Sequence, residues 1–276
     1  MLDFTLDTYR ALLEAFLQAG YRVLTFEQYC DLRAGGGQPA AKKSPFKGDL
    51  EGPYLILRHD VDRLPQNSRR TAEIEHALGV QATYYFRVYP KQTDEQQYIR
   101  SIAALRHEVG YHYEDMSIAK GDAAAAYTHF QSALAYLRGF YPVRTICMHG
   151  APTSQWDGKD LWKHYDYRAE GIVGEPYFDT PFGEVFYLTD TGRCWDGYRY
   201  SVRDKIPVHQ ERWTAEGLVY HRSADIIRAL QQGTFPTRLM MTTHPQRWTN
   251  SKTAWAREWV LQNSKNLIKY ALVRWR

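Results

Sequence analysis

Apolar runs and amphipathic stretches alternate along most of this chain. Apolar, β-branched or aromatic runs predict strands at residues 54–58, 82–88, 108–112, 143–148 and 238–243. Between the strands, apolar positions recur at helical spacing and predict helices near residues 66–78, 94–106, 122–138 and 222–232. This alternation is typical of an α/β fold in which helices cover a parallel sheet.

The two ends of the chain are also expected to be helical. Asp3 or Thr5 can cap a first helix that Gly20 ends, and a last helix is expected near residues 253–273. Further elements are a short strand at 21–26, a loop at 34–49 rich in Gly, Pro, Ala and Lys, and a weakly patterned region at 150–215 that contains a short strand at 185–190.

We expect the 276 residues to form one domain, because parallel α/β barrels often occupy this length as a single unit. Its expected parts are an N-terminal helix, strand and loop at 1–50, a catalytic core at 52–245 and a C-terminal helix at 250–276. We favour a barrel over an open doubly wound sheet, because several strand ends must converge on one pocket.

Four of the apolar runs end in aspartate or histidine, in the segments YLILRHDVD (54–62), HEVGYHYE (107–114), TICMHG (145–150) and LMMTTHP (239–245). Parallel strands deliver their C-terminal residues to one edge of the sheet, where α/β folds place their chemistry. The sequence therefore predicts one polar pocket that contains a metal ion.

Asp60 and Asp62 are the first candidates for this pocket. Two carboxylates this close repel each other, and both stay ionised most easily beside a cation. One of them can bind the metal while the other serves as base for a water molecule. Taken alone, the pair has a simpler interpretation, in which Asp62 caps the next helix and Asp60 is a loop residue.

The other strand ends contribute His112, Glu114, His149 and His244. Neutral imidazole and carboxylate both suit zinc and similar divalent ions. His149 and Glu114 compete as a further ligand, and His149 can instead contact the substrate. His107 and Glu108 are expected to be capping or solvated residues, because they lie where the preceding helix should end.

Several weaker candidates lie near these strand ends. Trp156, Trp195 and Trp248 could stack on sugar rings, although core packing is the more common role of each ring. Arg58 or Arg87 could bind an anionic substituent or merely pair with the acids. Asp190, Arg193 and Asp196 could orient the catalytic groups or form an ordinary turn with a surface ion pair. Together, Arg58, Trp156, Arg193, Trp195 and Trp248 are the candidate substrate-binding residues.

Composition narrows the function further. The net charge of +4 is mild and the basic residues are scattered, so nucleic-acid binding is not expected. Three cysteines without CxxC spacing are typical of reduced thiols, and no apolar run is long enough to span a membrane. The acidic N-terminus is unlike a signal peptide, and we expect a cytoplasmic protein.

The Asp-x-Asp segment, the HEVGYH segment and the late strand-end histidine together resemble the polysaccharide deacetylase family, the NodB-homology carbohydrate esterases. The resemblance covers about residues 52–245. It implies a distorted (β/α) barrel and removal of acyl groups from N-acetylated sugars, with zinc or a similar divalent ion as cofactor. The bond broken would be a carbon–nitrogen bond other than a peptide bond.

The resemblance also implies roles for individual residues. It makes Asp60 the base, Asp62 and His112 metal ligands and His244 the acid that protonates the leaving amine. Val61 separates two aspartates that are adjacent in the family, and Met116 stands where the family has a second ligand histidine. Glu114 or His149 would then supply the further ligand.

Two other functions are compatible with the same residues. A carbohydrate-binding or regulatory protein could keep the barrel without catalysis, which Val61 and Met116 would explain. A metal-dependent phosphoesterase could use the same Asp and His residues, with Arg58 or Arg87 holding phosphate. The chain length and composition do not indicate an oligomeric state.

Overall fold

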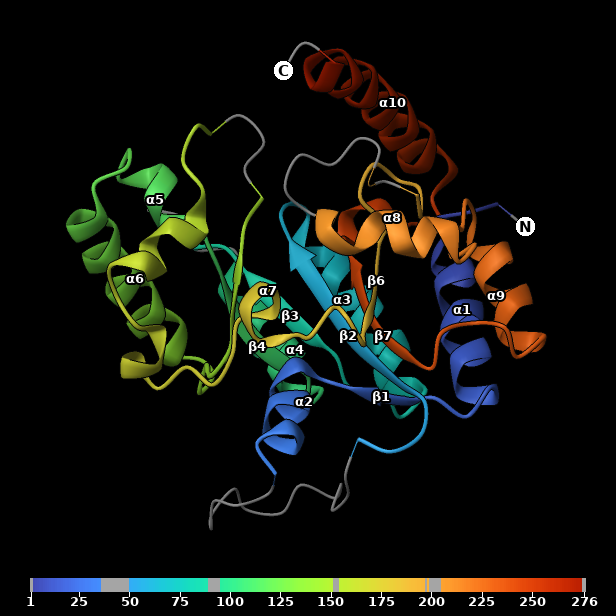
Figure 1. Cartoon of the computed structure of the whole chain (residues 1–276), viewed down its shortest axis with the longest axis horizontal. Helices are drawn as coiled ribbons and strands as arrows, with labels where there is room; N and C mark the ends of the chain where they lie inside the picture. Colours follow the sequence, from blue (N-terminus) through green and yellow to red (C-terminus); the bar gives the residue numbers. More distant parts are fainter. Residues whose placement is uncertain are drawn as a thin grey trace.

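Parallel strands form one sheet at the centre of the molecule (Figure 1). The computed structural model describes residues 2–35, 50–88, 95–150, 154–196, 198 and 205–274, with side chains as far as residue 266. The sheet contains seven strands, which are β1 (Arg22–Leu24), β2 (Tyr54–Val61), β3 (Thr83–Phe86), β4 (Glu108–Tyr113), β5 (Ile146–Met148), β6 (Phe186–Thr189) and β7 (Arg238–Thr243).

The central strand, β2, connects the two halves of the sheet. The strand order is β5-β4-β3-β2-β7-β6, and β1 pairs in parallel with the first residues of β2. Every described pairing is parallel. Within the described residues no strand ladder joins β5 to β6, so the sheet is a half-barrel. The expected α/β class with a parallel, barrel-type sheet is confirmed.

Helices cover the sheet, with α6 on one side and α1 beside α9 on the other (Figure 1). The α-helices are α1 (Leu6–Gln18), α2 (Phe26–Arg33), α3 (Pro65–Ala77), α4 (Glu95–Ala104), α5 (Asp115–Ile118), α6 (Ala123–Arg138), α7 (Pro176–Asp179), α8 (Pro207–Ala215), α9 (Ser223–Gln231) and α10 (Lys252–Arg274). Short 3-10 helices are η1 (Gly158–Lys163), η2 (Tyr167–Glu170) and η4 (Pro245–Arg247).

Local capping explains several helix starts. The Thr5 side chain accepts a hydrogen bond from the Thr8 backbone N–H and begins α1, as expected. The start of α3 differs from the capping interpretation of Asp62, because the N-cap residue is Leu64, at φ 52° with no side-chain cap, and Pro65 is the first helical residue. Asp62 is therefore free for another role.

The last helix, α10, packs on loops at the carboxyl edge of the sheet (Figure 1). Asn266 donates a hydrogen bond to the Gly192 carbonyl at 2.9 Å, and Arg63 lies 3.4 Å from Glu258. None of the helices in the described ranges is both long and apolar enough to cross a membrane. Most of the expected loop at 34–49 lies outside the described residues.

Candidate metal centre

The acidic and imidazole side chains predicted from the strand ends gather at the carboxyl edge of the half-barrel. Asp60 and Asp62 lie at the end of β2, His112 lies near the end of β4, and His149 and His244 follow β5 and β7. The parallel register places these strand ends side by side.

Three of these side chains converge on one point. Asp62 Oδ1 lies 3.4 Å from His149 Nε2 and 3.7 Å from His112 Nε2. The three donor atoms all lie within 4.8 Å of one another. Asp62 Oδ1 is shielded from solvent and receives no hydrogen bond of good geometry. A cation between these atoms would satisfy that oxygen and both imidazoles.

Hydrogen bonding prepares His112 to bind a cation. Its Nδ1 lies 3.0 Å from the Cys147 carbonyl oxygen, which can only accept, so Nδ1 carries the proton and Nε2 presents a lone pair. Burial lowers the pKa of His112 to about 4, against the opposing charge of Asp60. His112 is therefore neutral at physiological pH.

His149 lies between two carboxylates. Its Nδ1 is 3.1 Å from Glu114 Oε2, and its Nε2 faces Asp62. Burial opposes the charged form, but the hydrogen bonds to Asp62 and Glu114 outweigh it and raise the pKa of His149 to about 9. Without a cation, the Nε2 proton bridges towards Asp62, and a metal ion would take the place of that proton.

Glu114 lies behind His149 and outside the converging trio. Arg87 donates to Glu114 Oε1 from Nε at 2.9 Å and from Nη2 at 2.5 Å, while Oε2 accepts from His149. The structure thus places His149 with Asp62 and His112, and it places Glu114 where it orients the His149 ring.

Asp60 forms the floor of the centre together with Arg58 and Cys147. Asp60 Oδ2 is 3.7 Å from Arg58 Nη2 and 3.8 Å from His112 Nε2. Asp60 Oδ1 is buried and has no hydrogen-bond partner. Arg58 also donates to Cys147 Sγ at 2.5 Å. Arg58 thus contacts both the Asp60 carboxylate and the Cys147 sulfur.

His244 is held by a carboxylate from a different strand. Its Nδ1 lies 2.6 Å from Asp190 Oδ1, and its Nε2 lies 3.9 Å from Asp62 Oδ2. Asp190 also accepts hydrogen bonds from Trp248 Nε1 at 2.8 Å and from Arg247 Nη1 at 2.7 Å. Burial opposes ionisation of His244, yet the Asp190 charge and hydrogen bond contribute to a raised pKa.

Four of the expected substrate-binding side chains are buried. Arg58 and Trp248 have no exposed surface, and Trp195 is only 3% exposed, so neither indole offers a free face to a sugar. Arg193 is 8% exposed and donates to the Trp255 carbonyl at 2.9 Å. These four side chains pack in the core of the described structure, and their contact with a substrate stays a prediction.

The fifth candidate, Trp156, is partly buried and packs on Gly121. A Cβ atom on Gly121, whose φ is +89°, would lie 2.2 Å from Trp156 Nε1, so only glycine fits beneath this ring. The indole therefore has a packing role, and a substrate contact of Trp156 stays a prediction.

His107 and Glu108 differ from their expected capping or solvated roles. His107 is fully buried, with Nδ1 accepting from the Ala82 N–H at 3.2 Å and Nε2 donating to the Ala72 carbonyl at 3.0 Å. Glu108 is also buried and accepts from Thr83 Oγ1 at 2.7 Å. Glu108 is the first residue of β4 and His107 directly precedes it. Their hydrogen bonds connect the start of β4 to α3 and β3.

Cys147 and Arg247 are the site residues that sequence reasoning missed. Cys147 lies directly opposite His112 in the β4–β5 register, so both side chains point to the same face of the sheet. The sequence shows that Cys147 lies in the strand that follows the His112 strand. It does not show the register of the two strands, and so it does not predict that Cys147 lies opposite His112. Arg247 follows His244 by one turn and carries no separate signal.

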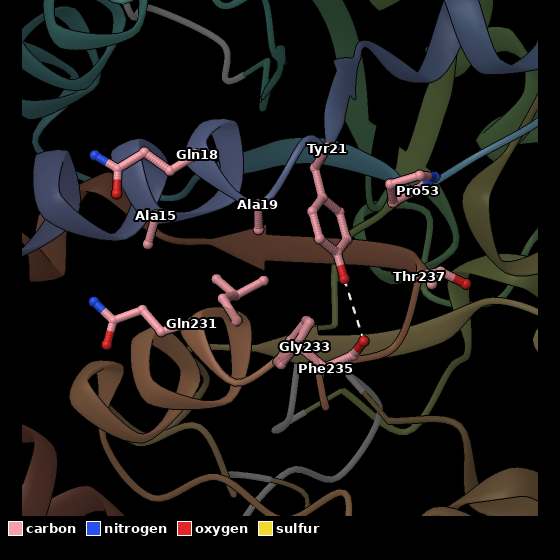
Figure 2. Close-up of a pocket in the computed structure, with 10 residues that line it drawn as sticks. Ala15, Gln18, Ala19, Tyr21, Pro53, Gln231, Gly233, Phe235 and Thr237 are labelled. Carbon is pink, nitrogen blue, oxygen red and sulfur yellow. Dashed lines mark hydrogen bonds between the residues drawn. The ribbon is translucent and has the colours of Figure 1, made fainter.

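A further cavity, of about 360 Å³, lies between α1 and α9 and shares no residue with the metal centre (Figure 2). Tyr21 donates a hydrogen bond to the Phe235 carbonyl at 3.3 Å across it. Gln18, Gln231 and Thr237 are its other polar lining residues. The lining contains no carboxylate, imidazole or thiol, and the cavity therefore lacks the groups that hydrolysis requires.

Fold and site together define an α/β half-barrel with an Asp/His centre at its carboxyl edge. No protein-family model and no curated protein matches the chain. Solved structures similar to it include a wild-type CE4 family pseudoenzyme from Bacillus anthracis, at 13% identity and a TM-score of 0.43, covering 81% of this chain and 67% of that one.

Two more solved structures are similar to the chain. A mutant of the same pseudoenzyme with restored enzymatic activity has 13% identity, a TM-score of 0.43 and coverage of 81% and 69%. PdaA from Bacillus subtilis, a family 4 carbohydrate esterase, has 9% identity, a TM-score of 0.41 and coverage of 92% and 83%. These likenesses concern the fold alone and carry no argument about activity.

Proposed function

We propose that this protein is a metal-dependent hydrolase that removes an acyl group, such as acetyl, from the nitrogen of an N-acylated sugar or a related amide. The observation that carries the proposal is the convergence of Asp62, His112 and His149 beside Asp60 and His244. The choice of an N-acylated sugar rests on the sequence resemblance to polysaccharide deacetylases.

A divalent ion, with zinc as the expected one, fits the residues that converge. One carboxylate and two imidazole nitrogens are a donor set typical of hydrolytic zinc sites, which keep a position open for water or substrate. Asp62 Oδ1 lies 3.7 Å from His112 Nε2, which presents a lone pair, and a cation between them would be bound by both. When bound, such an ion polarises a carbonyl group and lowers the pKa of a water molecule.

Asp60 is assigned as the base that takes a proton from the attacking water. Its Oδ1 is free of hydrogen bonds, and Arg58 Nη2 lies 3.7 Å from Oδ2, which orients the carboxylate. Because His112 Nε2 lies 3.8 Å from Asp60, the base lies next to the proposed ligands. Base catalysis of this kind contributes on the order of 10²- to 10⁴-fold in rate.

His244 is assigned as the acid that protonates the leaving amine. Asp190 accepts the Nδ1 proton, and this contact fixes the ring so that Nε2 faces the centre. The same carboxylate stabilises the imidazolium form, which is the form that can donate a proton. Both the proposed acid and the proposed base lie close to the proposed ligands, His244 at 3.9 Å from Asp62 and Asp60 at 3.8 Å from His112.

The phosphoesterase alternative has less support than the deacetylase one. Arg58 is fully buried against Cys147 and Thr242, and Arg87 is held by Glu114. Neither guanidinium is presented as a phosphate clamp, which phosphoryl chemistry usually requires.

Metal analysis combined with an activity assay on N-acetylglucosamine oligomers tests the proposal. Asp62→Asn should lose the bound metal, whereas Asp60→Asn should keep the metal and lose turnover. Asp160→Asn is the matched control, because Asp160 pairs with Lys163 on the surface. The mechanism would be refuted if the wild-type protein contained no metal after incubation with divalent ions, or if the Asp60→Asn variant were active.

A further inference from the structure

The floor of the metal centre contains a second set of donor atoms that the proposed ligands do not include. Asp60, His112 and Cys147 each offer one donor atom, and these atoms lie within 4.8 Å of one another. All three side chains are buried. Because His112 and Cys147 are paired residues of neighbouring parallel strands, their side chains project from the same face.

The Asp60 carboxylate supplies an independent indication of a missing partner. Asp60 is only 5% exposed, and its Oδ1 has no hydrogen bond. A buried carboxylate oxygen without a partner is costly, and the contact with Arg58 at 3.7 Å involves the other oxygen, Oδ2. A cation bound beside Cys147 would give Oδ1 a partner.

The surroundings of Cys147 suit a metal-bound thiolate. Arg58 Nη1 donates to Cys147 Sγ at 2.5 Å, which stabilises negative charge on sulfur. Burial opposes this and raises the pKa of the free thiol. On binding an ion, the thiol would release its proton to solvent, which leaves a thiolate beside the Arg58 guanidinium.

We propose that Asp60, His112 and Cys147 form an inner binding position for a strongly thiophilic divalent ion such as cadmium, overlapping the outer position of Asp62, His112 and His149. Thiolate favours soft ions, whereas the outer carboxylate and imidazole donors also accept harder ones. The two positions exclude each other, because both require His112. The outer position rests on the proposed function, and the inner one rests on its own three residues.

The inner position has a functional consequence. Asp60 is the proposed base, so an ion bound to it blocks proton removal from water. A thiophilic ion in excess therefore inhibits the enzyme, while an ion restricted to nitrogen and oxygen donors supports activity. The identity of the metal decides which position is filled.

Cadmium titration of metal-stripped protein tests the inner position, because cadmium–thiolate bonds absorb in the ultraviolet. The wild-type protein should develop this absorption until one ion is bound per chain, and Cys147→Ser should lose it. Cys30→Ser and Cys194→Ser are matched controls that should retain it, since these thiols lie outside the donor set. His149→Gln should also retain it, because His149 belongs only to the outer position.

A double variant keeps the test decisive if Cys147→Ser does not fold. Cys30→Ser combined with Cys194→Ser leaves Cys147 as the one thiol of the chain, and any thiolate absorption then belongs to it. Absence of absorption in the wild type and in this double variant would overturn the inner position.

The two proposals fail in different ways. Cadmium that binds through His149 without thiolate absorption would refute the inner position and leave the proposed function intact. Thiolate absorption in a protein that hydrolyses no N-acylated sugar with any divalent ion would support the inner position and refute the proposed function.

Discussion

Asp190 and His244 form a buried hydrogen bond of 2.6 Å between residues 54 positions apart in the chain. Asp190 follows β6 and His244 follows β7, and the parallel pairing of these two strands brings the two residues together. The carboxylate also accepts hydrogen bonds from Arg247 and Trp248, which hold it in place beside His244. The bond therefore orients the histidine towards the metal centre.

Asp190→Asn is expected to lower kcat on the order of 10²- to 10⁴-fold, because the amide no longer stabilises the imidazolium or fixes its tautomer. Metal content should remain unchanged, since Asp190 is not in the converging set. Asp196→Asn is the matched control, because Asp196 forms a similar contact of 3.0 Å with the exposed His221. Equal losses in both variants would contradict the orienting role.

Glu114→Gln is expected to weaken metal binding about 10- to 100-fold without abolishing it, because Glu114 orients a ligand without joining the trio. Competition with a chelator of known affinity measures the change. Glu73→Gln, which alters an exposed pair with Arg69, provides the control. Complete loss of metal in Glu114→Gln would instead identify this carboxylate as a direct ligand, the alternative that the sequence left open.

The pH dependence of stability should contain a contribution from Glu108. Burial, reinforced by the charge of Glu27, raises the pKa of Glu108 from 4.5 to about 7. The folded state therefore binds more protons than the unfolded state between these values, and stability falls as the pH rises through this range. Above the folded pKa, the loss is complete and on the order of 1–3 kcal/mol.

Urea unfolding at pH 5 and pH 7.5 measures this effect. Glu108→Gln cannot ionise, so the decrease in unfolding free energy between the two pH values should be smaller than in the wild type. Glu51→Gln serves as a control, because Glu51 is an exposed carboxylate. An unchanged decrease in Glu108→Gln would show that this buried carboxyl group does not carry the effect.

The sequence was sufficient to predict most of the helices and strands. It was also sufficient to predict that polar residues gather at the carboxyl edge of the sheet. Helical periodicity predicts α1 and α6 to within a few residues, because each buries one face. Continuous apolar runs predict β2 and β7, because these strands are buried on both faces. It does not predict α8, whose short sequence has one buried residue, Trp213. Short helices that bury little surface leave little periodic signal.

The site was predicted as a set of residues and not as an arrangement. Strand ends identify Asp60, Asp62 and His112, because parallel strands must align their carboxyl ends. Side-chain contacts between residues distant in the chain decide that His149, and not Glu114, lies with Asp62 and His112. Such contacts also decide that Trp195 is buried. Composition and periodicity contain no information on such contacts.

Glu75 is expected to be the most important buried charge for stability outside the metal centre. Its carboxylate lies 2.7 Å from His59 Nε2 and accepts from the Tyr84 hydroxyl at 2.9 Å, and Tyr9 and His107 also contact it. Burial opposes ionisation, but the charge of His59 contributes to a lowered Glu75 pKa. The cluster links α1, α3, β2 and β3.

Glu75→Ala should lower the free energy of unfolding by about 3–5 kcal/mol, because removal of one partner leaves buried imidazoles and hydroxyl groups unsatisfied. Glu73→Ala, two residues earlier on the same helix, is exposed and should change stability by less than about 0.5 kcal/mol. Urea unfolding of both variants measures the difference. Similar unfolding midpoints would show that the four partners of Glu75 find other hydrogen bonds, and that the cluster does not depend on its carboxylate.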